Sequence, residues 1–250
     1  AAISAVWVCG PGGTDGGMQA MTQSGGRRRI LPVLIAVMLL ITGVCSAQEE
    51  ATMDFRAMLR SRILEILNVW PAEDQYAIMF FIYPNEMYTY GEYENLPEFK
   101  MLYKREQDID HESNPLGMPA SDEGEERWNP AFWDWDTQGV VIDYGDVNPL
   151  TDAFVHWLEA TGVQDIGGEE MSGDWDENGV YIGNAPNGTA ELVQLAAEIA
   201  AELQTNGVIE AKFGRKLPIL LSDFEFTWYM VKATHEANPG GEAEAYVQYC

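Results

Sequence analysis

Positive charge is scarce in this sequence. Among its 250 residues, 14 are Lys or Arg and 40 are Asp or Glu, which gives a formal net charge of −26 at pH 7. So few cations cannot neutralise a row of phosphates, and the composition therefore argues against a nucleic-acid partner and against an anionic membrane surface. The acidic excess fits a soluble protein in a salty medium, or a protein that meets a basic partner.

The motifs of well-known catalytic sites are missing as well. No serine lies in a G-x-S-x-G context, and no glycine-rich phosphate loop occurs. No two of the three histidines, His111, His156 and His235, have the spacing of metal ligands. These absences favour a protein that is not an enzyme. With 40 acidic residues, however, a carboxylate pair for glycoside hydrolysis is still an alternative.

The sequence has three cysteines, and two of them, Cys9 and Cys45, lie in an N-terminal stretch that resembles a leader. Arg27-Arg28-Arg29 precede an uncharged run over residues 30–44, which small residues follow at 45–47. This order is typical of a secretory signal peptide, and the run is shorter than the ~20 residues of a membrane-spanning helix. An uncleaved anchor is the alternative. Cleavage would leave Cys250 as the only cysteine, so the exported domain is expected to fold without an internal disulfide.

We therefore predict three parts of the chain. Residues 1–20 are interpreted as an upstream or disordered segment, 21–47 as the signal peptide, and 48–250 as a single domain of ordinary size. The predicted location is secreted or periplasmic. Within the domain, residues 105–127 hold eight acids, two prolines and two glycines. This composition predicts a long exposed acidic loop without regular structure.

Hydrophobic periodicity predicts both helices and strands in the domain. Apolar residues recur at helical spacing over 50–70 and 189–206, and Asn148-Pro149 marks the start of a helix that ends at Thr161. Unbroken or short apolar runs at 76–83 and 140–144 are typical of strands. The alternation predicts an α+β fold, in which helices pack on one side of a mostly antiparallel sheet.

The segment 217–240 combines the two kinds of signal. Its apolar start, 217–221, predicts one buried strand, and Ser222 stands three residues before Glu225 as in a capping box. We expect a helix from residue 223 to residue 237, which ends before Asn238-Pro239. Its core-facing stripe is expected to hold Trp228, Val231 and His235.

The segment 128–135, WNPAFWDW, mixes tryptophan with aspartate. Rings that stack on pyranose faces, beside carboxylates that accept sugar hydroxyls, would make a carbohydrate platform. The favoured interpretation is instead a turn whose rings fill the core, because aromatic side chains mostly serve packing. The candidate binding residues are Trp128, Trp133, Asp134 and Trp135.

A second candidate site is a loop with a calcium-binding pattern. Asp174, Asp176, Asn178 and Gly179 fit D-x-[DN]-x-[DN]-G, in which alternate oxygen ligands and a turn-making glycine suit Ca²⁺. The position of the bidentate glutamate in a full loop is Ala185 here, so a polar hairpin turn is the favoured interpretation. We expect no cofactor, with calcium as the alternative.

The order of these pieces resembles the bacterial domain of unknown function 4303 family. The shared features are an N-terminal amphipathic helix, the strand YAIMFFIY, the turn WNPAFW, the helix Leu192–Leu203, and a block that starts at LLSDFEF and ends at ATHEANP. The resemblance implies an α+β domain with no established reaction, loosely associated with the gene neighbourhoods of secreted toxins and their immunity proteins. The export leader and the acidic insertion at 105–127 depart from the family pattern.

Two functions stay open at this point. The first hypothesis is an exported, acidic, non-catalytic binding module, similar to an immunity protein, whose partner is a basic protein. The second is an extracellular protein that binds or acts on carbohydrate through the aromatic cluster between Trp128 and Trp135.

Overall fold

A computed structural model describes residues 54–84, 93, 96–106, 125–143, 149–167, 185–224 and 227–250. Contacts divide the chain into units 1–43 and 44–250, and every described residue belongs to the second. The predicted segments 1–20 and 21–47 lie outside the described residues. None of the described helices is long and apolar enough to cross a membrane.

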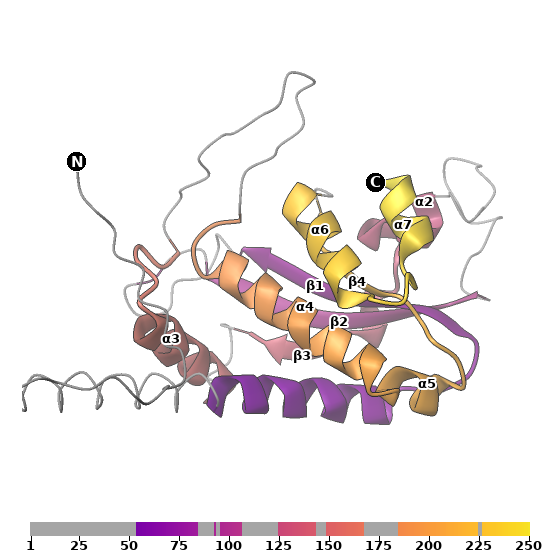
Figure 1. Ribbon diagram of the computed structural model, residues 1–250, viewed down its shortest axis with the longest axis horizontal. Coiled ribbons are helices and arrows are strands. Elements are labelled where there is room, and N and C mark those ends of the chain that lie inside the picture. Colours follow the sequence, from indigo (N-terminus) through magenta and orange to yellow (C-terminus); the bar gives the residue numbers. More distant parts are fainter. Residues whose placement is uncertain are drawn as a thin grey trace, which may run out of the picture. The chain divides into compact units, whose positions relative to one another are not determined.

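The sheet is built around β1 (Gln75–Pro84), of which all but the last two residues are buried. β2 (Pro97–Arg105) runs antiparallel to β1, and β3 (Gly139–Ile142) runs antiparallel to β2. β4 (Ile219–Ser222) joins the other side of β1 in parallel, which gives the order β3-β2-β1-β4. The predicted α+β class with a mostly antiparallel sheet is confirmed (Figure 1).

Helices of very different length surround this sheet. The long ones span residues 54–69, α3 (Pro149–Thr161), α4 (Thr189–Thr205) and α6 (Trp228–Ala237). The short ones are α2 (Glu125–Trp128), α5 (Val208–Phe213) and α7 (Glu244–Tyr249), with 3-10 turns η2 (Pro130–Phe132) and η3 (Trp135–Thr137). The helices predicted over 50–70, 149–161 and 189–206 are thus present within the described residues.

The two faces of the sheet are covered differently. Ile78, Phe80 and Ile82 of β1 pack in one core cluster with the long helices, whose apolar stripes supply Leu, Ile and Ala. Met79 and Phe81 point the other way, into a smaller cluster with Trp128, Trp133 and Tyr246. The sequence analysis placed helices on one side only, and this was wrong because short helical segments rich in aromatic residues cover the second face.

Both edges of the sheet are hydrogen-bonded by side chains from neighbouring helices. On β4, Thr234 Oγ1 accepts from Leu221 N at 2.8 Å and donates to Leu221 O at 3.0 Å. Asn238 does the same for Ile219, with Oδ1 accepting at 2.9 Å and Nδ2 donating at 2.7 Å. Four residues of helix rise about 6 Å and two residues of strand about 6.6 Å, so the two spacings match.

The opposite edge is held by Arg62 of the 54–69 helix. Its Nε and Nη2 donate to Val140 O of β3 at 3.0 and 2.8 Å. Because unpaired backbone groups on an edge strand attract other strands, this contact occupies a carbonyl that would otherwise be open to such pairing. At the first edge, the bonds of Thr234 and Asn238 fix α6 alongside β4, where one wall of the candidate site is formed.

Two expectations for local structure are corrected here. The helix predicted from residue 223 does not begin there: Ser222 is the last residue of β4, its Oγ donates to Asp223 O at 2.9 Å, and α6 begins at Trp228, while Glu225 lies outside the described residues. The unstructured loop predicted over 105–127 is too long at both ends. Arg105 is the last residue of β2, and Arg127 is a buried residue of α2. Residues 107–124 lie outside the described residues.

Candidate docking groove between α4 and α6

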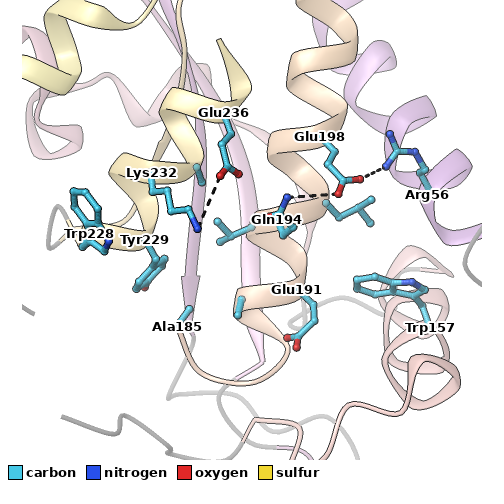
Figure 2. A pocket seen from close by; sticks show the side chains of 14 residues that line it. Arg56, Trp157, Ala185, Glu191, Gln194, Glu198, Trp228, Tyr229, Lys232 and Glu236 are labelled. Carbon is cyan, nitrogen blue, oxygen red and sulfur yellow. Dashed lines mark hydrogen bonds and ion pairs between the residues drawn. The ribbon is translucent and has the colours of Figure 1, made fainter. Parts of the chain in front are cut away.

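A groove of about 640 Å³ lies between α4 and α6 and reaches toward α3 and the 54–69 helix. Figure 2 shows α6 contributing one wall and α4 the other. Small apolar side chains, Ala190, Val193 and Ala233, line it between the walls. The polar and aromatic lining residues are Arg56, Glu191, Gln194, Glu198, Trp228, Tyr229, Lys232, Glu236 and Trp157.

The start of α4 is set by its first turn. Gly188 precedes the helix with φ of 92°, a conformation that L side chains rarely adopt, and its N–H donates to Glu191 Oε2 at 2.7 Å. Glu191 thus satisfies a backbone donor at the helix N-terminus, where a carboxylate is also favoured by the helix dipole. Apolar residues such as Leu192, Leu195 and Ile199 bury one stripe of α4, which leaves Gln194 and Glu198 exposed toward the groove.

The start of α6 is set by a buried carboxylate. Asp223 is only 3 % exposed and accepts from Thr227 Oγ1 at 2.8 Å and from Tyr229 OH at 3.0 Å. These bonds orient the first turn of α6 from the end of β4. Trp228, between the two donors, is left 53 % exposed. It is one of three large apolar side chains that are exposed in the described part of the chain, with Val69 and Phe224.

Trp228 and His235 were both expected on the core-facing stripe of this helix, and both are exposed. The helix begins five residues later than the capping box implied, and Thr234 and Asn238 hydrogen-bond it to the edge of β4. Its buried side is therefore made by Met230, Ala233, Thr234 and Ala237. Val231 is buried as predicted.

Carboxylates stand on both walls of the groove. Glu198 on α4 accepts from Arg56 Nη1 at 2.8 Å, and Glu236 on α6 faces Lys232 at 4.0 Å (Figure 2). Arg56 is shared with Glu202 at 3.5 Å. The Lys232–Glu236 pair is long and exposed, with side-chain exposures of 63 % and 41 %, so it contributes little stability and both groups can exchange it for another partner.

Every Lys and Arg in the described part of the chain is engaged inside the protein. These residues are all the cations of the sequence except Arg27-Arg28-Arg29. Arg105 also has an interaction. The partners are carboxylates for Arg56, Arg60, Arg62, Lys100, Arg127, Lys216 and Lys232, and backbone carbonyls for Lys104, Lys212 and Arg215. Many acids, among them Glu73, Asp136, Glu210 and Glu244, are exposed. The charge that this surface offers to a partner is therefore negative.

The aromatic segment predicted as a carbohydrate platform lies mostly in the core. Trp128 is 5 % and Trp133 3 % exposed, so neither presents a ring face to solvent. Trp133 Nε1 donates to Arg127 O at 3.0 Å. Asp134 is exposed, and its carboxylate accepts from Asp136 N at 3.0 Å as the cap of η3. This burial agrees with the interpretation in which the rings fill the core.

Trp135 is the one tryptophan of that segment that is not buried, and the structure brings it to a residue that sequence reasoning missed. Its ring lies 5.9 Å from that of Phe224, which is 45 % exposed. Both rings stand edge-on to buried Phe81, at 4.9 and 4.7 Å. Residues 135 and 224 are far apart in sequence, so no local pattern could have paired them.

The remaining candidates give no site within the described residues. Asp174, Asp176 and Asn178 lie outside them, as does His111. Ala185, which takes the place of the bidentate glutamate, is buried. His156 is exposed and contacts Asp152 O of its own helix at 2.7 Å. No group of three or more His, Cys, Asp or Glu able to hold a metal occurs in the described ranges.

Comparison with protein-family models, with curated proteins and with solved structures finds no match to this chain.

Proposed function

We propose that this chain is an acidic, non-catalytic binding module that is exported and recognises a basic protein. The observation that carries the proposal is the distribution of charge: the cations of the described part are engaged internally, and the exposed groups are mainly carboxylates. A partner approaching such a surface is steered by its own positive charge. The resemblance to the domain of unknown function 4303 family favours a toxin-like protein as this partner.

The α4–α6 groove is the site that we propose for this recognition. It places an exposed tryptophan, Trp228, beside carboxylates from two walls. Aromatic residues in partly desolvated pockets are the usual anchors of protein interfaces, and charged rims add association rate and specificity. The groove therefore supplies both an apolar anchor and acidic groups for a basic segment.

Isothermal titration calorimetry tests the proposal by measuring the affinity of the protein for two synthetic helical peptides. One peptide consists of Leu and Lys, and the other of Leu and Glu. At about 10 mM salt, where screening extends over ~30 Å, the cationic peptide is expected to bind and the anionic one not. Affinity should fall by at least about tenfold at about 0.1 M salt. Equal affinity for the two peptides, or no binding of the cationic one at low salt, would overturn the proposal.

Two charge-neutralising variants locate the site. Glu236→Gln, in the groove, is expected to lower the affinity for the cationic peptide about two- to fivefold, which is the contribution of one exposed ion pair. Glu73→Gln removes an exposed acid from the turn before β1, outside the groove lining, and should leave the affinity unchanged. If the two variants weaken binding equally, the peptide follows net charge alone and the groove is not the site.

A carbohydrate-binding role is the second candidate, and the exposed ring of Phe224 beside Trp135 favours it. Stacked or tilted aromatic pairs at a surface suit the apolar face of a sugar ring. A glycan array probed with the protein and with Trp135→Ala tests this role. This second role requires a positive array whose signal Trp135→Ala removes; an array without response would eliminate it.

A further inference from the structure

We infer that the α4–α6 groove accepts an α-helix of the partner. The side chains on the contacting face of this helix follow the order apolar, acidic, basic, starting from the Trp228 end of the groove. The inference rests on the proposed function, because it names the shape and side-chain order of the basic segment. It comes from three features of the groove: the mostly small apolar residues in its lining, the spacing of the groups on α6, and the two carboxylates, Glu198 and Glu236, that face each other from opposite walls.

The floor of the groove suits a third helix. Two helices lie side by side and form its walls (Figure 2), and the aliphatic residues that α4 and α6 contribute to its lining are Ala190, Val193, Leu195 and Ala233, of which only Leu195 is large. Small residues let a helix approach to the short end of the 8–10 Å range of helix–helix packing. The backbone edges of β4 are already hydrogen-bonded by Thr234 and Asn238, so no strand edge is offered here for an extended peptide.

The wall made by α6 presents three different groups at helical spacing. Trp228, Lys232 and Glu236 are four residues apart and all line the groove. Four residues rise about 6 Å along a helix, so the three groups span about 12 Å. A partner helix lying along α6 places its residues i, i+4 and i+7 on one face over nearly the same length. An apolar residue then meets Trp228, an acidic one Lys232 and a basic one Glu236.

The opposite wall strengthens the choice at the basic end. Glu198 of α4 stands across the groove from Glu236, while Gln194, one turn earlier, is neutral (Figure 2). Glu198 keeps its bond to Arg56, but a guanidinium between the walls would still face two carboxylates from two helices. Tyr229 adds a second ring beside Trp228 at the apolar end. The rings of Trp228 and Tyr229 thus lie at one end, where Glu191 is held by the Gly188 N–H, and Glu198 and Glu236 lie at the other, with Arg56 beside Glu198.

The test uses four alanine-based peptides of identical composition and equal net positive charge. One carries Leu, Glu and Arg at i, i+4 and i+7, and its control exchanges Glu and Arg; the other two are the reversed sequences of these, since a helix can enter in either direction. Fluorescence anisotropy measures their affinities for the full chain at low salt, and circular dichroism measures helix formation in the complex. In one direction, the matched peptide is expected to bind about tenfold more tightly than its exchanged control, because the exchange places like charges opposite each other.

Variants of the protein show which contact sets this preference. Trp228→Ala is expected to lower the affinity of the matched peptide about tenfold, as for a hot-spot aromatic residue, and Glu73→Gln to leave it unchanged. Binding of all four peptides with equal affinity and steep salt dependence would leave the acidic module standing and overturn the helix order. If none of the four peptides binds at low salt, the proposed function itself is overturned, and the inference with it.

Discussion

Two tryptophan-containing regions of this molecule have opposite roles. In the segment 128–135, Trp128 and Trp133 are buried against β1, and Trp133 donates its indole N–H to a backbone carbonyl. At the start of α6, Trp228 is half exposed and stands beside Lys232 and Glu236 in a groove. The segment in which tryptophan and aspartate alternate is structural, whereas the isolated tryptophan on a helix is the candidate for binding.

The comparison shows that the burial of a tryptophan depends less on its neighbours in the sequence than on which elements cover the sheet beside it. The long helices cover one face of the sheet, and the rings of Trp128, Trp133 and Tyr246 complete the other. α6 also hydrogen-bonds the edge of β4, and its Met230 and Ala233 join the core while Trp228 stays exposed. Four predictions test this contrast.

The largest effect is expected at Trp133. Trp133→Ala should lower the free energy of unfolding by about 3–5 kcal/mol, because it empties a buried ring site and leaves the carbonyl of Arg127 without this donor. Urea denaturation followed by circular dichroism measures the change. A loss below about 1 kcal/mol would mean that the ring is not part of the core.

A smaller but substantial effect is expected at Asn238, which holds α6 to the edge of β4. Asn238→Ala should cost about 2–3 kcal/mol, since it leaves the buried N–H and C=O of Ile219 unpaired and removes a partner of Gln204. The same denaturation experiment applies, with Glu236→Gln as the control on the exposed side of α6. If the two variants unfold alike, polar contacts do not fix this helix.

The pH dependence of stability tests how the aromatic segment is anchored. The guanidinium of Arg127 lies over the Tyr76 ring at 4.5 Å and pairs with Glu106 at 2.6 Å, and its hydrogen bond holds the pKa of Glu106 below the ordinary value of 4.5. A lowered folded-state pKa adds stability above the ordinary pKa and loses it as pH falls through the lowered one. Glu106→Gln should therefore be less stable than the parent at neutral pH.

That difference between the parent and Glu106→Gln should shrink on acidification and vanish below the lowered pKa. Denaturation midpoints measured from neutral to strongly acidic pH follow it. A difference that stays constant over this range would show that Glu106 acts through packing rather than through its charge.

The smallest change in stability is expected at Trp228. Trp228→Ala should alter the free energy of unfolding by no more than about 0.5 kcal/mol, because half of the side chain is already in water. Thermal unfolding with Trp133→Ala alongside gives the comparison. A loss similar to that of Trp133→Ala would place Trp228 in the core and remove the groove as a binding site.

The sequence predicted those helices and strands in which apolar residues form an unbroken run or recur at a regular spacing. β1 and β4 are apolar runs without interruption, and α3 and α4 have a clear apolar stripe, so local patterns sufficed. β2 was missed because Glu98, Lys100 and Lys104 interrupt its apolar residues, although Glu98 and Lys104 are buried. Glu98 pairs with Lys100, two residues further along the same strand, and Lys104 donates to the carbonyl of Phe132, which is distant in sequence; hydrophobic periodicity registers neither contact.

The candidate site could not have been predicted in the same way. The groove depends on where α6 begins, and this is decided by bonds from Asp223 to Thr227 and Tyr229 and by the contacts of Thr234 and Asn238 with β4. A local capping pattern at Ser222 suggested an earlier start and therefore the wrong face for Trp228. The acidity of the surface was visible from composition, but the internal engagement of the cations required the fold.

The most direct test of the account is a titration of the protein, labelled with ¹⁵N, with the matched Leu-Glu-Arg peptide while the indole N–H signals of its tryptophans are followed by NMR. Replacement of single tryptophans by phenylalanine assigns the signals. We predict that the Trp228 signal shifts progressively while those of Trp128 and Trp133 stay in place. Movement of the Trp135 signal with a stationary Trp228 would contradict the account, because it would place binding on the aromatic segment instead of the α4–α6 groove.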